Sequence, residues 1–363
     1  MKIEGAVLRS SDGTYELEDL NIRQPQAGEL LIRIVGVGMC HTDLLPRRSD
    51  YTAALPIVTG HEGSGVVEEV GPGTEGYEIG DHVVLSFDAC RTCTNCISAH
   101  PAYCDTFFAR NLTGTGMGHD VVVTDGNGAP VSARWFGQSS FASHTIVRAA
   151  NAVKIARDLP LELLGPFGCG IQTGAGSILV ALNVRAGSSL IVYGVGGVGL
   201  SAIMAARIAG ATTIIAVDLN PPRRDLALEL GATHAVDGAR HDLLDRLLDL
   251  TRGGAQFALD TTGVPAVIDT AVNAIRPTGI CGLVGVQRGD LVLAPRTLAV
   301  GRTVTGILEG DAVPHVLIPQ LLELWRQGRF PFDKMIKTYP LTHINEAEQD
   351  TIAGKTVKPV LLP

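Results

Sequence analysis

Four cysteines that lie close together in the sequence could hold a metal ion. Cys90, Cys93 and Cys96 are each separated by two residues, and Cys104 follows after seven more. Four soft thiolates with no open position are typical of a closed structural zinc site and not of magnesium or calcium, with an iron–sulfur cluster as the alternative. The spacing therefore predicts a loop site that ties down a long lobe and does no chemistry itself.

A glycine-rich turn between two apolar runs could bind the pyrophosphate of a dinucleotide. The run Leu190–Tyr193 leads into Gly194-Val-Gly196-Gly-Val-Gly199, and small apolar residues continue to Ala209. This order predicts a strand, a turn and a buried helix. Gly194 would allow the tight turn, Gly196 would let the backbone approach the phosphates, and Gly199 would let the helix pack against the strand.

A carboxylate follows where such a site needs an acceptor for the adenosine ribose. A second apolar run ends on Asp218, 19 residues beyond Gly199, which suits hydrogen bonds from the ribose hydroxyls. The alternative is a membrane span, because Ala186–Ala206 carries no charge over 21 residues. The glycines and the polar cluster after Asp218 favour a buried phosphate turn, so we expect a dinucleotide site and no membrane segment.

Length and composition narrow the class of protein. The chain has 363 residues, of which 45% are hydrophobic, 18% are charged and 43 are glycine, and these values describe a compact two-domain enzyme with many turns. A net charge of -8 without a run of Lys or Arg argues against a nucleic-acid partner. No apolar signal segment opens the sequence, so we expect a cytoplasmic location. In the cytoplasm, seven cysteines are more typical of metal binding than of disulfides.

The order of predicted elements indicates two kinds of domain. Up to about residue 150, short alternating runs broken by glycine and proline predict the hairpins of a small barrel. Beyond Asp218, helices and strands alternate as far as Ile307, which implies a parallel, doubly wound sheet. From about Pro314 the chain carries one long helix and short strands, and we expect these to rejoin the first domain.

Three further residues could form a catalytic metal site. Cys40, His61 and Cys169 are far apart in the sequence, but each adjoins or closely follows glycine at a predicted turn. Two cysteines and a histidine with an open fourth position are the ligands of a catalytic zinc. Spacing alone leaves this grouping open, because a buried free cysteine or a satisfied core histidine explains each residue singly. Cys281 lies within a predicted strand and is interpreted as a core thiol.

These motifs together resemble one family over essentially the whole chain. The pattern Gly60-His-Glu-x-x-Gly65-x5-Gly71, the four-cysteine lobe, Cys169 and the glycine turn are similar to the zinc-dependent alcohol dehydrogenases of the medium-chain dehydrogenase/reductase superfamily. Within that family, Ile307–Asp311 and Gln327–Phe332 resemble the aryl (benzyl) alcohol dehydrogenases.

The resemblance implies an α/β plus β fold with two domains. A GroES-like β-barrel catalytic domain would cover residues 1–170 and be completed by 309–363, and a Rossmann domain with a doubly wound parallel sheet would bind NAD over 171–308. The active-site zinc would lie between the two domains. A homodimer or homotetramer is implied.

The resemblance also implies the reaction. A primary alcohol, aromatic or allylic, would bind zinc through its oxygen, lose its proton to Thr42 and pass a hydride to NAD+, and the reverse reaction would reduce the aldehyde. A polyol dehydrogenase and a glutathione-dependent formaldehyde dehydrogenase are alternatives within the family. A zinc-free quinone reductase or a non-catalytic NAD-binding protein would be expected to lack the ligands or Thr42, which are present here.

Residue by residue, the family pattern implies two zinc ions per chain. Cys40, His61 and Cys169 match the catalytic ligands, and the lobe cysteines match the structural ones. Glu62 matches a carboxylate that can approach the metal, and Asp43 matches an acid that orients His61 through its remote nitrogen. For Thr42, the alternative is a threonine that merely caps a helix turn.

Further matches concern the cofactor. His41 and Lys358 match basic residues that face the pyrophosphate, while Thr173 and Val198 match residues that hold the nicotinamide. The complete predicted cofactor site comprises His41, Thr173, Gly194, Gly196, Gly197, Val198, Gly199, Asp218, Arg223, Val286 and Lys358.

The substrate pocket is predicted from matching positions and apolar character. Phe141 is the first candidate for its wall, followed by Phe87, Leu45 and Leu308. The alternative for Phe141 is a position in the barrel core. Leu45 departs from the family pattern, since many relatives have a histidine there that passes the proton to solvent. We therefore expect the proton to leave through the ribose hydroxyls or through His41.

Overall fold

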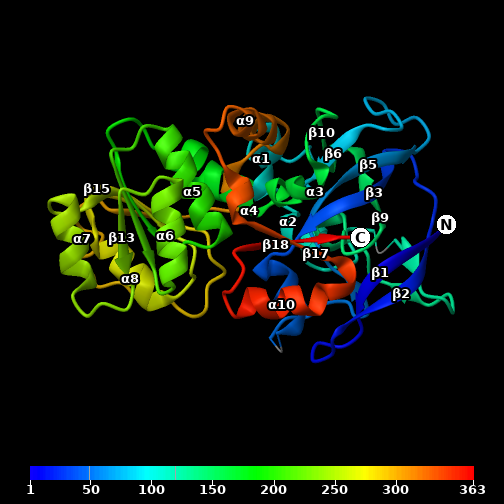
Figure 1. The fold of residues 1–363 in the computed structure, drawn as a ribbon, viewed down its shortest axis with the longest axis horizontal. Coiled ribbons are helices and arrows are strands. Elements are labelled where there is room, and N and C mark those ends of the chain that lie inside the picture. Colours follow the sequence, from blue (N-terminus) through cyan, green and yellow to red (C-terminus); the bar gives the residue numbers. More distant parts are fainter. Residues whose placement is uncertain (49, 119) are drawn as a thin grey trace. The chain divides into compact units, whose positions relative to one another are not determined.

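The computed structural model describes residues 1–48, 50–118 and 120–363. The chain divides into two compact units (Figure 1). The first comprises Met1–Cys169, Val313–Pro319 and Asp333–Pro363, and the second comprises Gly170–Ala312 and Gln320–Phe332. The limits expected from the sequence, 1–170 with 309–363 for the GroES-like domain and 171–308 for the Rossmann domain, remain our proposal for the two domains.

The first unit is built from short strands and shorter helices. Its strands are β1 (Lys2–Leu8), β2 (Tyr15–Ile22), β3 (Glu29–Gly38), β4 (Ile57–Val58), β5 (Glu62–Val70), β6 (His82–Leu85), β7 (Val123–Thr124), β8 (Pro130–Val131), β9 (His144–Arg148), β10 (Ala152–Ile155), β17 (Ile336–Pro340) and β18 (Lys358–Leu362). Its helical segments include η1 (His41–Arg47), α1 (Thr94–Ile97), η2 (Pro101–Tyr103), α2 (Phe107–Asn111), η3 (Trp135–Gly137), α3 (Leu161–Leu164), η5 (Gly165–Gly168) and α10 (Ile344–Ile352).

Two sheets make up this unit. One has the order β4-β1-β2-β7-β8, and the other has the order β10-β6-β5-β3-β18-β17 with β9 added on β3. The apolar strand β3 pairs with three strands. Strand β5 pairs along most of its length, β9 pairs with its beginning, from Glu29 to Arg33, and β18 pairs with its end, at Val37 and Gly38. This pairing returns the C-terminal strand β18 to the first unit, as the sequence predicts (Figure 1).

The second unit holds a parallel six-stranded sheet with the order β13-β12-β11-β14-β15-β16. Its strands are β11 (Ser189–Tyr193), β12 (Thr213–Asp218), β13 (His234–Asp237), β14 (Ala255–Asp260), β15 (Ile275–Leu283) and β16 (Thr303–Gly306). Its helices include α4 (Gly170–Gly176), the π-helical η6 (Ser177–Ala181), α5 (Gly197–Ile208), α6 (Pro221–Leu230), α7 (Leu243–Thr251) and α8 (Pro265–Asn273). Helix α9 (Pro314–Arg326) begins in the first unit and ends in the second.

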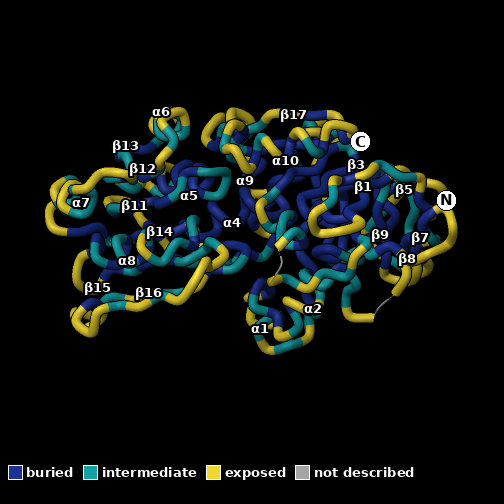
Figure 2. Tube along the Cα trace, turned by 90° about the horizontal axis from the view of Figure 1, so that it is seen from below, coloured by how far each residue is buried: buried dark blue, intermediate teal, exposed yellow. Residues whose placement is uncertain are grey.

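Alternating side chains of β11 show that helices cover both faces of this sheet. Ile191 and Tyr193 belong to the buried cluster that contains Leu247 of α7 and Ile268 of α8. Val192 points the other way, where a Cβ on Gly199 of α5 would lie 3.3 Å from its side chain. Four of the five residues of β11 are buried for this reason, and Figure 2 colours the tube by this burial. The fold is doubly wound as predicted.

The order of strands reverses beside β11, which neighbours β12 on one side and β14 on the other. Such a switch point is where dinucleotides bind to this fold. The uncharged stretch Ala186–Ala206 is divided between β11 and α5. Among the residues that the structure describes, no single helix could cross a membrane, and one bent pair, Leu161–Gly168 with Gly170–Ala181, passes by length and composition only.

Candidate active site

The four cysteines of the predicted lobe site come together. Their sulfur atoms all lie within 4.8 Å of one another, and Cys90 Sγ lies 3.8 Å from Cys96 Sγ. The backbone amides of Thr92 and Cys93 donate to Cys90 Sγ at 3.4 and 3.2 Å. These hydrogen bonds favour the thiolate, and the pKa of Cys90 is lowered to about 5. Four thiol groups with this spacing fit a closed zinc site.

Cys40, His61, Glu62 and Cys169 form a second cluster in the same unit. One ligand atom from each lies within 4.8 Å of the others, and His61 Nε2 is 3.2 Å from Cys169 Sγ. Cys40 immediately precedes η1, His61 precedes β5, and Cys169 follows η5. Interactions with Cys169 and His61 hold the pKa of Cys40 well below its usual value. Two thiols and one imidazole nitrogen at these distances fit a zinc ion with an open position.

Asp43 fixes the orientation of His61. Its Oδ1 lies 2.7 Å from His61 Nδ1 and accepts the Gly60 amide at 3.0 Å, while Oδ2 accepts the Cys40 amide at 3.1 Å. An Nδ1–H donated to a carboxylate leaves Nε2 as the basic nitrogen for a metal. The geometry fits the positioning role expected for Asp43.

Trp135, which no sequence pattern singles out, also contacts Asp43. Its indole Nε1–H donates to Asp43 Oδ1 at 3.1 Å, and its side chain is fully buried. A buried indole needs an acceptor, and here that acceptor is the carboxylate that holds His61.

The aromatic side chain of Phe136 packs directly against the second cluster. Its ring stacks on His61 with 4.2 Å between centroids and 23° between planes. The stacking depends on a left-handed backbone, since Phe136 has φ 51° and Gly137 has φ 67°. Sequence reasoning missed Phe136, because nothing in the pattern around Trp135 indicates this turn.

Phe141 is packed tightly within the first unit. Its ring is fully buried and packs edge-on against Tyr15 at 5.9 Å. A Cβ on Gly60 would come within 2.5 Å of the Phe141 ring, so glycine is required there, and Gly60 has φ 85°. This packing favours the barrel-core alternative for Phe141.

The other predicted pocket residues are spread over the chain. Phe87 is buried against Phe107 at 5.7 Å, Leu45 is half-buried on η1, and Leu308 is half-buried in the second unit. Their role as pocket walls remains a prediction.

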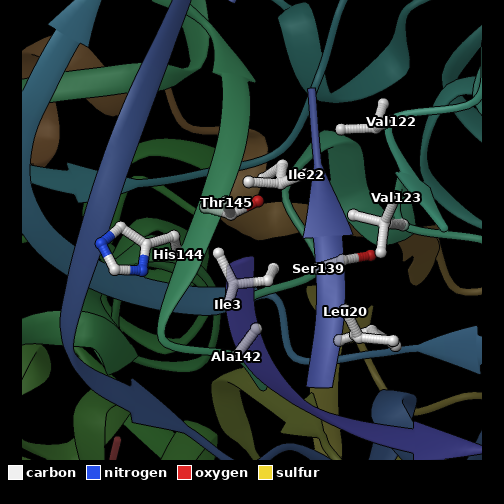
Figure 3. Close-up of a pocket in the computed structure, with 11 residues that line it drawn as sticks. Ile3, Leu20, Ile22, Val122, Val123, Ser139, Ala142, His144 and Thr145 are labelled. Carbon is white, nitrogen blue, oxygen red and sulfur yellow. The ribbon is translucent and has the colours of Figure 1, made fainter. Parts of the chain in front are cut away.

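A cavity within the first unit is too small to hold the substrate. Its volume is about 10 Å³, and Ile3, Leu20 and Thr145 are among its lining residues (Figure 3). One water molecule needs about that much space. An alcohol with an aromatic ring must therefore bind elsewhere.

Glu62 and Lys358 form a buried ion pair. Lys358 Nζ donates to both Glu62 oxygens at 2.9 Å and to the carbonyl oxygen of Met39 at 3.2 Å. Burial raises the pKa of Glu62, and the charge of Lys358 opposes that rise. A Cβ on Gly38 would lie 2.0 Å from Glu62 Oε2, so this glycine makes room for the carboxylate. Lys358 was expected to face the pyrophosphate, and its contacts here favour a partner within the protein instead.

Thr42 and His41 lie on η1 directly after Cys40. Thr42 is half-buried and His41 is exposed. The N-cap residue of η1 is Cys40, so helix capping does not account for Thr42. Its proposed role as proton acceptor is compatible with this position next to a metal ligand.

The glycine turn of the second unit has the geometry that a dinucleotide needs. Gly194 has φ 80°, and a Cβ on Gly199 would lie 2.1 Å from the Gly194 oxygen. A Cβ on Gly196, by contrast, would meet nothing within 4 Å, which leaves space over the backbone at the start of α5. The turn therefore fits a pyrophosphate.

Asp218 braces that turn. It ends β12, and its Oδ2 accepts the Val195 amide at 2.8 Å while Oδ1 accepts the Asn220 amide at 2.8 Å. Each carboxylate oxygen keeps a further lone pair for a ribose hydroxyl.

The structure also locates the remaining predicted cofactor residues in the second unit. Gly197 and Val198 open α5, Arg223 is half-buried on α6, and Val286 is exposed after β15. Thr173 is buried on α4, and its hydroxyl donates to Glu309 Oε2 at 3.4 Å.

Comparison with known proteins decides the family. Residues 26–157 match the alcohol dehydrogenase GroES-like domain, and residues 197–326 match the zinc-binding dehydrogenase domain. The chain is 47% identical to the geraniol dehydrogenase of Castellaniella defragrans, over 99% of this chain and 97% of that protein. The chain belongs to the zinc-binding alcohol dehydrogenases.

Further relatives agree with this family. The NDMA-dependent alcohol dehydrogenase of Amycolatopsis methanolica is 37% identical over 100% of this chain and 99% of its own length. The crystal structure of benzyl alcohol dehydrogenase from Acinetobacter calcoaceticus matches with a TM-score of 0.96 at 42% identity, over 100% of this chain and 99% of that chain. An alcohol dehydrogenase zinc-binding domain protein from Burkholderia ambifaria matches with a TM-score of 0.98 at 48% identity, over 100% and 99% of the two chains.

These matches confirm the predicted fold class, family and cofactors. The dehydrogenase combines a GroES-like domain with a Rossmann domain, uses zinc and NAD, and interconverts alcohols and aldehydes. Zinc supplies a Lewis acid for the alcohol oxygen, and NAD+ supplies the hydride acceptor.

Proposed function

We propose that this dehydrogenase oxidises primary aromatic and allylic alcohols with NAD+. Its relatives include a geraniol dehydrogenase at 47% identity and a benzyl alcohol dehydrogenase at 42%. Geraniol and benzyl alcohol share a primary carbinol carbon attached to a π system. The observation that carries the proposal in this chain is Phe136, whose ring stacks on His61 and so places an aromatic surface against one of the proposed zinc ligands.

The chain's own residues are assigned the following parts. Cys40, His61 and Cys169 hold the catalytic zinc, and Asp43 keeps the proton on Nδ1 of His61 so that Nε2 faces the metal. Thr42 accepts the proton of the alcohol. The lobe cysteines hold a second, structural zinc.

Glu62 is kept beside the metal cluster by Lys358. With Leu45 on η1 in place of a relay histidine, the proton leaves Thr42 through the cofactor ribose or His41. We further propose that the enzyme acts in the cytoplasm as a homodimer or homotetramer.

A substrate series tests the proposal. Values of kcat/KM with NAD+ are measured for benzyl alcohol, geraniol, ethanol, sorbitol and S-(hydroxymethyl)glutathione. Burying about 60 Å² of additional apolar surface at about 25 cal/mol per Å² favours benzyl alcohol over ethanol by about 1.5 kcal/mol, or about tenfold. A preference for ethanol, sorbitol or the glutathione adduct would refute the aryl and allylic assignment but leave the family unchanged.

Two phenylalanines provide a matched comparison. Phe136→Ala should lower kcat/KM for benzyl alcohol about tenfold while that for ethanol changes little, because the lost surface lies beside the metal cluster. Phe141→Ala should lower thermal stability and affect both alcohols equally, because Phe141 packs within the barrel. The opposite pattern would make Phe141 the wall of the pocket, as the sequence first indicated.

A further inference from the structure

The turn Glu309–Asp311, labelled η7, has a backbone that ordinary residues avoid. Three successive residues have positive φ, at 49° for Glu309, 71° for Gly310 and 52° for Asp311. Two of the three carry side chains, for which the left-handed region is unfavourable. Such a conformation persists only where the surrounding structure holds it.

Helix α4 holds this turn by direct backbone contact. A Cβ on Gly310 would lie 2.7 Å from the carbonyl oxygen of Gln172 and 2.9 Å from that of Thr173. A Cβ on Gly176 would likewise lie 2.7 Å from the Gly310 oxygen. All seven residues of α4 are buried, so the turn and the helix form one rigid contact within the second unit.

The contact brings the Glu309 carboxylate against Thr173. Glu309 is 5% exposed, and its Oε2 accepts the Gln172 side-chain amide at 3.3 Å and the Thr173 hydroxyl at 3.4 Å. Both of these donors are neutral groups. They hold the acidic group at a fixed position against α4.

Sheet topology assigns this position to the nicotinamide half of the cofactor site. The glycine turn and Asp218 stand at the carboxyl ends of β11 and β12, where the adenosine half binds. The other half of a doubly wound sheet, here β14–β16, receives the second nucleotide. Glu309 follows β16 after only two intervening residues beyond Gly306.

We propose that the Glu309 carboxylate, fixed by the strained turn on α4, faces the nicotinamide and favours binding of NAD+ over NADH. The oxidised ring carries a positive charge and the reduced ring does not, so a buried carboxylate discriminates between them by charge. The proposal rests on the NAD dependence of the enzyme and on the nicotinamide contact that the family resemblance implies for Thr173. It is independent of which alcohol is oxidised.

The test compares cofactor affinities of the purified, metal-loaded protein. Dissociation constants for NAD+, NADH and ADP-ribose are measured by calorimetry for the wild type, Glu309→Gln and Glu229→Gln. Glu309→Gln should weaken NAD+ about tenfold, as expected for removal of one nearby buried charge, with NADH and ADP-ribose changed less than about twofold. Glu229→Gln, which makes the same change at an exposed site on α6, should change none of the three.

Two outcomes for Glu309→Gln would overturn the proposal. An equal weakening of all three ligands would make Glu309 a structural support only, and an unchanged affinity for NAD+ would place its charge outside the reach of the nicotinamide. Glu309→Asp is the second variant, because it keeps the charge. Its ratio of NAD+ to NADH affinity should stay within about threefold of the wild type, and a loss as large as that of Glu309→Gln would contradict a role based on charge. A failure of the substrate series leaves these binding results unaffected, so the two proposals fail separately.

Discussion

Replacing Lys358 by methionine removes the cation of a buried ion pair and keeps the length of the side chain. The side chains of Lys358 and Glu62 are 6% and 0% exposed, and Nζ contacts both carboxylate oxygens at 2.9 Å. The variant therefore leaves a carboxylate with little access to water. We expect Lys358→Met to destabilise the protein strongly at neutral pH.

The stability lost in Lys358→Met depends on whether Glu62 stays ionised or becomes protonated. Breaking a buried pair costs about 3–5 kcal/mol, but Glu62 can take up a proton. From an unfolded pKa of about 4.3, protonation at pH 7 costs about 3.7 kcal/mol, at about 1.36 kcal/mol per pH unit. The same step at pH 5 costs only about 1 kcal/mol.

The stability penalty of Lys358→Met should therefore increase with pH. Without Lys358, the folded pKa of Glu62 rises further above its unfolded value, so the penalty is small at low pH and grows as the pH rises. The penalty of Lys358→Met should be about 3–4 kcal/mol at pH 7 and about 1 kcal/mol at pH 5.

Urea unfolding of the metal-loaded protein measures these values for the wild type, Lys358→Met, Glu62→Gln and the double variant. The double variant should be more stable than Lys358→Met, because it buries no lone charge. A penalty below about 1 kcal/mol at pH 7, or one equal at the two pH values, would refute the reasoning. If Lys358→Met instead kept its stability and lost affinity for NAD+, Lys358 would face the pyrophosphate, as the sequence predicted.

Two further predictions concern catalysis and acid stability. Thr42→Val should lower kcat for benzyl alcohol by about 10² to 10⁴, the worth of a positioned acid–base group, while Thr42→Ser keeps activity; a near-normal rate in the valine variant would remove Thr42 from the proton path. Burial raises the pKa of Glu29, but hydrogen bonds from Arg23 and Arg134 outweigh burial and lower this pKa to about 2. The ionised carboxylate therefore stabilises the fold above about pH 4. This stabilisation is lost between about pH 4 and pH 2. Allowing for partial exposure, Glu29→Gln should cost about 1–2 kcal/mol at pH 7 and show a shallower acid decline in urea unfolding, and a decline parallel to the wild type would contradict that assignment.

The metal and cofactor sites could be predicted because their chemistry requires particular residues at particular spacings. The lobe cysteines lie within 15 positions, and the glycine turn shows its function through residues that must lack a side chain. Cys40, His61 and Cys169 could be grouped only through the resemblance to a family. The distances among their ligand atoms now support that grouping.

The surroundings of the catalytic cluster could not be predicted, because they depend on contacts distant in sequence and on unusual backbone angles. Glu62 and Lys358 are separated by 296 positions, and no periodic pattern links them. Phe136 reaches His61 only through a left-handed turn, whereas Phe141, five residues later, packs against Tyr15. An apolar residue type alone cannot distinguish these two positions.

Zinc content measured together with turnover tests the central claim most directly. The wild type should hold two zinc ions and reduce NAD+ with benzyl alcohol, and Cys281→Ala, which changes a buried thiol outside both clusters, should do the same. Cys40→Ser should fold with one zinc ion and no turnover, whereas Cys96→Ser should lose stability and the lobe zinc but keep turnover in its folded fraction. Two zinc ions and normal turnover in Cys40→Ser would contradict the assignment of the catalytic site.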